Sequence, residues 1–303
     1  MNLSFKLLNS QMAQWKEIAW CGVRFKTPVD WHLSQIGIRY LALEDELGPV
    51  MEIKWAPVKG KFSKKTHLKR LAALQKKQLR KSIKSKPASE HWQSVLSGFE
   101  TSEFSWQADA VHGQGLILFC PTCRNATLIQ FFQKQSDKDD PVATQVLNTF
   151  RDHRSDGQVL WAAYDIRALV PESFQLERYR FEAGQFELEF AKGSEHIILY
   201  RWAPASVLLR RQDLVQFAKT VAGLGKTEPV AGNMAGCQTV EWSVSPASSW
   251  QRWLSRFKLK ASYYWLGLWH LEAKNRILCV RAEGKKPLDA ELLNSIFTHY
   301  ESI

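Results

Sequence analysis

FKTPVDW at residues 25–31 recurs in altered form as ALVPESF at residues 168–174. Further along each half, KWAP at residues 54–57 recurs as RWAP at residues 201–204. Two more pairs keep the same order in both halves: GFETSEFS at 98–105 with GCQTVEWS at 236–243, and DP with LNT in 140–149 with KP and LNS in 286–295. Four repeated motifs in the same order predict that one unit of roughly 145 residues is used twice.

The pattern inside each half predicts the fold class. Short alternating segments separated by tight turns indicate antiparallel strands. Helical periodicity predicts a mid-unit and a closing helix in each half: residues 63–86 and a helix from Pro141 in the first, residues 211–223 and 287–300 in the second. We therefore predict an α+β protein of two similar halves, each an antiparallel sheet with a mid-unit helix and a closing C-terminal helix. The predicted parts are an N-terminal arm at 1–17, a first repeat at 18–155 and a second repeat at 156–303, packed as an internal pseudo-dimer within a monomer.

Composition places the chain among globular proteins. It has 303 residues, of which 45% are hydrophobic and 23% charged, with 13 Trp. No uncharged apolar run approaches the roughly eighteen residues of a membrane span, and the first residues lack the features of a secretory signal. Five Cys is an odd number in a chain of this size, which argues against a disulfide framework. The predicted location is the cytoplasm.

The positive charge is concentrated in one segment. The net charge is +11, and the stretch from Lys59 to Lys86 holds twelve Lys or Arg and no acid, so the rest of the chain sums to −1. In the predicted helix at 63–86, apolar residues such as Leu68, Leu71 and Leu79 form one stripe. The opposite side carries the cations Lys69, Arg70, Lys76, Lys77, Arg80, Lys81 and Lys84.

Two interpretations of this cationic face stay open. It is either a solvated helix surface or a binding site for a polyanion, such as a phosphate backbone, an anionic lipid surface or an acidic protein. The corresponding helix at 211–223 has no such face, so the fold does not require one. Aromatic residues for base stacking are not interleaved with the cations, which disfavours sequence-specific reading of nucleic acid.

Cys120-Pro121-Thr122-Cys123 lies at a predicted turn between two apolar strands. Two thiolates at this spacing supply half of a tetrahedral zinc site, but the sequence shows no second pair. Cys120 and Cys123 are therefore reduced structural thiols, ligands of a metal, or a redox pair. A thioredoxin-type pair would stand at a helix N-terminus in a βαβ unit, which this pattern does not predict. We predict no cofactor.

A short helix is predicted at residues 248–257, in an insertion specific to the second half. Trp250, Trp253 and Phe257 share one face at helical spacing, and they pack either on the sheet of their own half or on a partner or membrane surface. Metalloprotease, nucleophile-elbow, P-loop and dinucleotide-binding motifs are absent from the sequence. We therefore predict that the protein is not an enzyme.

A strand that ends in proline with an aromatic residue soon after, followed by a meander with one helix and then a closing helix, resembles the Mog1p/PsbP-like fold. Phe25, Pro28 and Trp31 carry this resemblance in the first half, and Pro171 and Phe174 in the second. It implies a binding role, because members of that fold are mostly adaptors, chaperones or assembly factors without catalysis of their own. No functional residue of the family can be placed on this sequence.

These observations predict a non-enzymatic, adaptor- or chaperone-like protein that binds a protein partner. One alternative is a polyanion-binding protein that acts through the helix at 63–86. The other is a Cys-based metal or redox site at Cys120 and Cys123.

Overall fold

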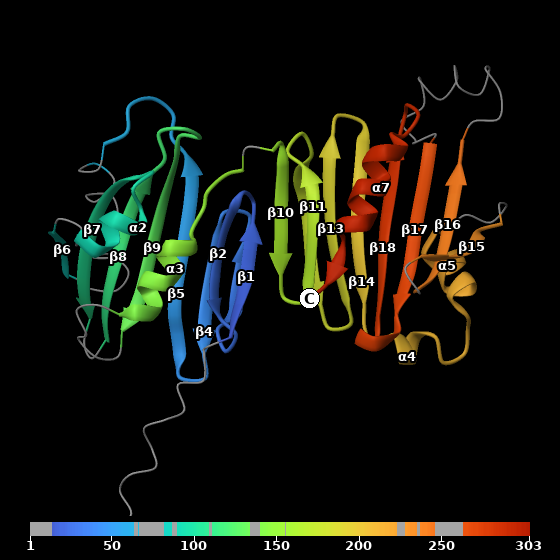
Figure 1. The fold of residues 1–303 in the computed structure, drawn as a ribbon, viewed down its shortest axis with the longest axis horizontal. Helices are drawn as coiled ribbons and strands as arrows, with labels where there is room; N and C mark the ends of the chain where they lie inside the picture. The colour runs from blue at the N-terminus through green and yellow to red at the C-terminus, as the bar shows by residue number, and fades with distance from the viewer. Residues whose placement is uncertain are drawn as a thin grey trace, which may run out of the picture. The chain divides into compact units, whose positions relative to one another are not determined.

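The computed structural model describes residues 14–63, 66, 82–86, 90–108, 111–133, 140–154, 156–222, 228–234, 237–245 and 263–303. The chain divides into two compact units, one of residues 1–155 and 162–164 and one of residues 156–161 and 165–303. Strands dominate both units (Figure 1). Within the described ranges, no helix is long and apolar enough to cross a membrane.

The first unit is built on a seven-stranded antiparallel sheet with the order β3-β4-β5-β9-β8-β7-β6. Its strands are β3 (His32–Gly37), β4 (Tyr40–Asp45), β5 (Gly48–Pro57), β6 (Ser82–Lys86), β7 (Glu100–Ala108), β8 (Val111–Phe119) and β9 (Asn125–Gln133). A separate hairpin pairs β1 (Trp15–Trp20) with β2 (Val23–Pro28). Cys21 and Gly22 form its turn, both with positive φ.

The second unit contains another seven-stranded antiparallel sheet, with the order β12-β13-β14-β18-β17-β16-β15. Its strands are β12 (Gln175–Glu182), β13 (Gln185–Lys192), β14 (Glu195–Trp202), β15 (Val230–Met234), β16 (Cys237–Val244), β17 (Tyr263–Leu271) and β18 (Arg276–Gly284). Two further strands of this unit, β11 (Ile166–Pro171) and β19 (Glu301–Ser302), pair antiparallel, and β10 (Gln158–Ala163) has residues in both units. The two large sheets thus share one strand order; the duplication itself stays a prediction.

Two short helices, α2 (Glu90–Val95) and α3 (Pro141–Thr149), accompany the sheet of the first unit. The Trp92 ring packs against Phe131 at 6.3 Å, and its indole Nε1 donates to Thr144 Oγ1 at 3.1 Å, which joins α2, α3 and β9. Asp140 caps α3 by accepting a hydrogen bond from the Val142 N–H at 2.8 Å. The opposite face of the sheet carries a second apolar cluster around Phe104, Trp106 and Ile117.

Aromatic rings of this second cluster lie directly over glycines of β8. A Cβ added at Gly115 would stand 2.4 Å from the Phe104 ring and 2.7 Å from the Ile129 carbonyl oxygen. We expect Gly115→Ala to lower the free energy of unfolding by about 2 kcal/mol, because a ring and a strand backbone must both move. Gly98→Ala is the matched control, since no atom lies within 4 Å of its added Cβ. Urea unfolding curves of the two variants test this, and equal stabilities would contradict it.

In the second unit, helices pack on both faces of the sheet. They are α4 (Ala205–Leu208), α5 (Leu214–Ala222) and α7 (Ala290–His299), with a 3-10 turn η1 (Glu272–Lys274). Phe217 of α5 meets Trp202 edge-on at 5.3 Å, within a cluster that includes Trp242 and Leu266. On the other face, Phe297 of α7 contacts Trp269 at 4.3 Å.

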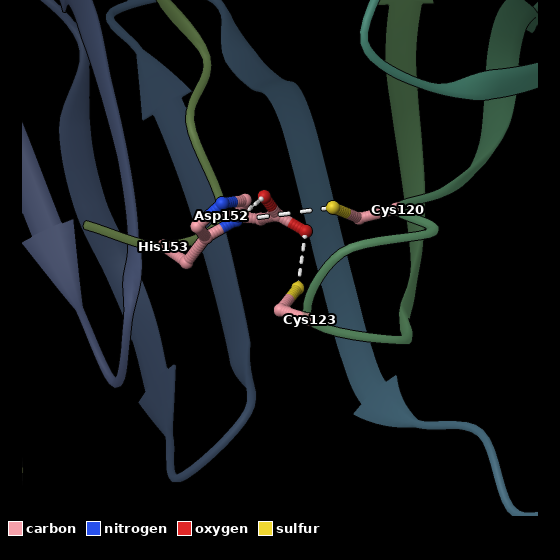
Figure 2. Close-up of side chains that lie close together, drawn as sticks. All are labelled: Cys120, Cys123, Asp152 and His153. Atoms are coloured by element: carbon pink, nitrogen blue, oxygen red, sulfur yellow. Dashed lines mark hydrogen bonds and ion pairs between the residues drawn. The ribbon is translucent and has the colours of Figure 1, made fainter. Parts of the chain in front are cut away.

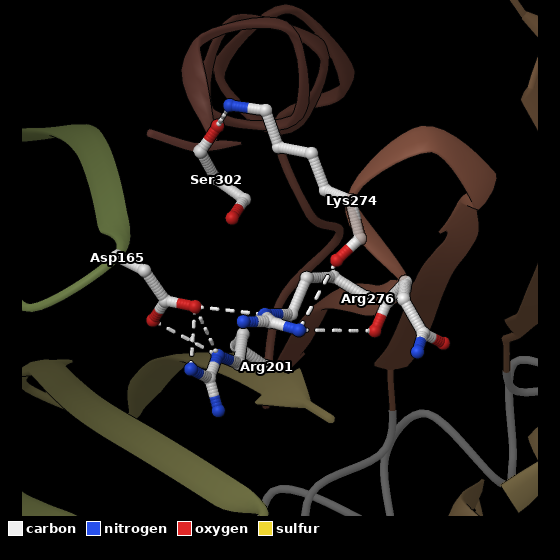
Figure 3. A network of polar contacts seen from close by, with 6 residues as sticks. Asp165, Arg201, Lys274, Arg276 and Ser302 are labelled. Atoms are coloured by element: carbon white, nitrogen blue, oxygen red, sulfur yellow. Dashed lines mark hydrogen bonds and ion pairs between the residues drawn. The ribbon is translucent and has the colours of Figure 1, made fainter. Parts of the chain in front are cut away.

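A charged network fixes one end of β14 (Figure 3). Arg201 belongs to the repeated RWAP motif. Its guanidinium makes a bidentate contact with the Asp165 carboxylate, with Nε 3.0 Å from both oxygens. Arg276 Nε donates to the same carboxylate at 2.8 Å. The Arg201 guanidinium also lies 4.0 Å over the Phe186 ring, and its side chain is only 9% exposed. In the first unit the corresponding Lys54 is 52% exposed and pairs with Glu52 instead.

The structure corrects the predicted fold class. The prediction of two α+β halves, each with a mid-unit helix and a closing helix, is wrong, because the described residues form mostly antiparallel sheet and the longest helix among them, α7, has 10 residues. Residues 82–86, predicted as the end of the basic helix, form strand β6, in which Ile83 pairs with Trp106 of β7. Residues 15–17, predicted as part of an N-terminal arm, belong to β1. Residues 82–86 pair with β7 and residues 15–17 pair with β2 of the same hairpin, so strand pairing outweighs the local pattern in both places.

Candidate metal centre

Cys120 and Cys123 lie in the tight turn between β8 and β9. The Cys120 N–H donates to the Asn125 carbonyl at 3.0 Å, and the Arg124 N–H donates back to the Cys120 carbonyl at 2.9 Å. Arg124 adopts the left-handed conformation with φ of 60° that closes this loop. The turn leaves Cys120 buried and Cys123 half-buried, with both sulfurs on the side of the segment that follows α3.

Asp152 and His153 approach this turn from the segment after α3. Phe150, the C-cap of α3, is fully buried and packs against Phe99 at 5.6 Å. The next residue, Arg151, forms a two-hydrogen-bond bridge with Arg24 of β2, with both N–O distances 2.8 Å. These two anchors hold the backbone that leads into Asp152, so its side chain is buried while that of His153 is partly exposed.

The four side chains converge on one point (Figure 2). Their ligand-type atoms, two sulfurs, one carboxylate oxygen and one imidazole nitrogen, all lie within 4.8 Å of one another. The Cys123 thiol donates to Asp152 Oδ2 at 2.9 Å, and His153 Nδ1 lies 2.7 Å from Asp152 Oδ1. Cys120 Sγ is 3.8 Å from the same His153 Nδ1.

These distances fit a small cation after a minor adjustment. Zinc bonds of about 2.3 Å to sulfur and 2.0–2.2 Å to nitrogen or oxygen place tetrahedral ligands roughly 3.3–3.8 Å apart. The contact from Cys120 to His153 already has this length. The two contacts of Asp152 are hydrogen bonds and would lengthen by about 0.5 Å or more when a cation replaces the shared protons.

The environment of Cys123 favours the protonated thiol. Burial is the main cause, and the hydrogen bond to the Asp152 carboxylate adds to it; together they raise the pKa of Cys123 to about 12. A thiol with a raised pKa is a poor nucleophile toward disulfides and oxidants, because the thiolate is the reactive form. The arrangement therefore disfavours a redox pair, one of the alternatives open at the sequence level.

A Cys–His–Asp catalytic relay does not fit the geometry either. In such a relay the carboxylate contacts one imidazole nitrogen and the nucleophile contacts the other. Here the Asp152 carboxylate and the Cys120 sulfur both face Nδ1 of His153. Two thiols, one imidazole and one carboxylate instead form the mixed sulfur, nitrogen and oxygen set that zinc prefers, whereas magnesium and calcium take oxygen ligands.

A second cluster, Glu177, Glu189 and His196 on strands β12 to β14, is a weaker candidate. The Arg178 guanidinium lies 2.8 Å from Glu189 and already supplies the balancing positive charge. Glu177 is 53% exposed, and His196 Nδ1 is 3.8 Å from it. Because one ligand is exposed and another is already paired with arginine, this set offers a cation little gain.

Of the remaining sequence-predicted site residues, the structure describes only Lys84. Lys84 lies in strand β6, where its backbone pairs with Ser105. The predicted polyanion ligands Lys69, Arg70, Lys76, Lys77, Arg80 and Lys81 and the predicted partner contacts Trp250, Trp253 and Phe257 lie outside the described residues.

Sequence reasoning found two of the four candidate ligands and missed Asp152 and His153. They lie 29 residues or more from Cys123 along the chain, and no spacing rule connects the two segments. The adjacent Asp-His pair directly after the α3 helix was the available signal. It becomes meaningful only once α3 is packed beside the β8–β9 turn.

No protein-family model matches the sequence, and no curated protein matches it closely enough to indicate a relative. Among solved structures, the apo form of the immunity protein TplEi of the T6SS from Pseudomonas aeruginosa aligns over 95% of this chain and 97% of its own, with 11% identity and a TM-score of 0.35. The same protein complexed with an "L" peptide gives 12% identity over 95% and 98%, at 0.34. MucB in complex with MucA(peri) gives 8% identity over 92% and 82%, at 0.20. TM-scores this low carry no argument about fold or function, and the resemblance to the Mog1p/PsbP-like fold stays a prediction.

Proposed function

We propose that this chain is a non-enzymatic binding protein whose first unit holds one structural zinc ion through Cys120, Cys123, Asp152 and His153. The observation that carries the metal assignment is the convergence of these four ligand atoms within 4.8 Å. Four protein ligands complete a tetrahedral shell and leave no open position for a substrate or a reactive water, which is the pattern of structural rather than catalytic zinc.

The role of the metal follows from what it joins. Cys120 and Cys123 belong to the β8–β9 turn, and the other two ligands follow the bridge between Arg151 and Arg24 of β2. One zinc ion would thus join the large sheet to the segment after α3, which is itself hydrogen-bonded to β2 through Arg151 and Arg24. A cation bound only by the folded unit stabilises it by mass action.

The wider role that we infer is partner binding of the adaptor or chaperone kind. The closed ligand set supports it indirectly, because it gives the metal no catalytic task. Polyanion binding through the segment from Lys59 to Lys86 is the second candidate, and the twelve cations without an acid in that segment favour it.

Metal analysis tests the assignment. Protein purified without chelators and dialysed after zinc loading should contain about one zinc ion per chain. Cys123→Ser should reduce this to well below one, whereas Cys237→Ser, a half-buried cysteine of the second unit, should leave it unchanged. Asp152→Asn provides a second probe should the first variant fail to fold. Substoichiometric zinc in the wild-type protein, or equal zinc in all variants, would refute the metal centre.

A further inference from the structure

One face of the first unit carries a groove of about 620 Å³ that the metal centre does not use. Its floor is formed by β5, β8 and β9, on the face of the sheet that carries the cluster around Phe104 and Trp106, and one wall is the segment that follows β5. The apolar lining includes Ile117, Ala126 and Leu128. The groove therefore presents aliphatic surface at the bottom.

The charged residues that line this groove, among those that the structure describes, all have one sign. They are Lys54, Lys59 and Lys61, without an acid in the described lining. Lys54 is already engaged, because its ammonium lies 2.7 Å from Glu52 and 4.9 Å over the Tyr40 ring. Lys59 and Lys61 are exposed, and among the residues that the structure describes no acid pairs with either. Two unneutralised ammonium groups above an aliphatic floor favour an occupant that is both anionic and apolar.

We propose that this groove binds an acidic, partly apolar segment of a partner protein in extended conformation. In an extended peptide successive side chains point to opposite sides, so apolar residues can enter the floor while the intervening carboxylates reach the lysines. This inference rests on the partner-binding role proposed above and is independent of the metal.

A nucleic acid fits the same groove less well. Binding of single strands relies on aromatic side chains that are free to stack on bases. Phe62, which follows Lys61 in the chain, is already stacked on Phe119, with centroids 4.3 Å apart and planes 7° from parallel. Trp55 also lines the groove, but it is only 4% exposed and its indole Nε1 donates to the Cys21 carbonyl. The groove therefore favours apolar side chains over stacked bases.

The test uses fluorescence anisotropy with three labelled probes of about a dozen residues or nucleotides. One peptide alternates Glu and Leu, a second alternates Glu and Ser, and the third probe is single-stranded DNA. The Glu–Leu peptide should bind most tightly, and its affinity should fall between roughly 50 and 200 mM salt without vanishing, because part of the binding is apolar.

Two double variants of equal net charge locate the site. Lys59→Glu/Lys61→Glu should weaken binding of the Glu–Leu peptide by about tenfold. Lys26→Glu/Lys286→Glu, at exposed positions outside the groove, should change it by less than about threefold. Equal losses in both variants would show that only overall charge matters. Equal binding of the Glu–Ser peptide would remove the role of the floor, and tighter binding of DNA would make the groove a polynucleotide site.

Zinc content measured on the same preparations keeps the two proposals apart. The groove variants change no candidate ligand of the metal, so their zinc content should equal that of the wild type. Loss of peptide binding with retained zinc is the expected result. Absence of peptide binding in the zinc-loaded wild type overturns the groove proposal and leaves the metal centre in place.

Discussion

Replacing Asp165 with alanine is expected to lower the free energy of unfolding of the second unit by about 3 kcal/mol. The change removes the shared acceptor of Arg201 and Arg276 and leaves the Arg201 guanidinium, with a side chain only 9% exposed, without its counter-charge. Breaking a buried ion pair costs about 3–5 kcal/mol. The lower end applies here because the Asp165 side chain is 22% exposed.

The control for Asp165→Ala is Glu301→Ala. Glu301 also pairs with an arginine of the second unit, with its carboxylate 2.9 Å from Arg167, but the two side chains are 53% and 35% exposed, far more than that of Arg201. Removing this surface pair should cost less than about 1 kcal/mol. Thermal and urea unfolding of the two variants provide the comparison, and a loss at Asp165 no larger than that at Glu301 would contradict the importance of the network.

A further variant distinguishes the cost of leaving a buried charge unpaired from the loss of the ion pair itself. In Asp165→Ala/Arg201→Met the buried cation is removed together with its partner, so the desolvation penalty of an unpaired charge disappears. This double variant should recover part of the stability lost in Asp165→Ala. The recovered stability measures how much of the loss in Asp165→Ala comes from leaving the Arg201 guanidinium buried without a counter-charge. The remainder comes from removing a favourable contact.

The position of many strands could be predicted from local pattern, because alternation and turns repeat along both halves, but the predominance of sheet over helix could not. Arg201 lies in the repeated RWAP motif, but its ion pair with Asp165 has no sequence signal, because Asp165 lies in another strand connection. The strand conformation of residues 82–86 could not be predicted from the sequence. Ile83 continues a helical apolar stripe in the sequence, and only its pairing with Trp106, far along the chain, makes it part of a strand.

The candidate metal centre shows the same limit. The turn with Cys120 and Cys123 is a local motif and was identifiable as half of a zinc site. The other half depends on two tertiary features, burial of Phe150 and the bridge between Arg24 and Arg151. Because ligand sets are assembled from segments that meet only in the folded state, a single sequence reveals such a site incompletely.

The affinity of the first unit for zinc is expected to rise steeply with pH. Zinc binds the thiolate, so each coordinating thiol that is protonated beforehand must release its proton. Burial and the Asp152 hydrogen bond raise the pKa of Cys123 to about 12, so this thiol is protonated throughout the neutral range. Cys123 alone should therefore increase the apparent affinity about tenfold per pH unit, or about a hundredfold between pH 6 and pH 8. Competition with a chelator of known affinity, corrected for the protonation of the chelator, measures this.

The sign of the effect on stability differs between the two forms of the protein. Without zinc, a raised thiol pKa means that the folded state keeps its proton longer than the unfolded chain, so the contribution of Cys123 is complete below about pH 8.5 and declines as the pH rises toward 12. With zinc bound, the thiolate is the required form and this decline disappears. The stabilisation by zinc should thus grow with pH.

Cys21→Ala is the control for the pH dependence of zinc affinity. Burial also raises the pKa of Cys21 to about 12, but Cys21 is not one of the four candidate ligands. Its removal should therefore leave the increase of zinc affinity with pH unchanged. A zinc affinity that stays flat between pH 6 and pH 8 would show that Cys123 does not bind the metal as a thiolate.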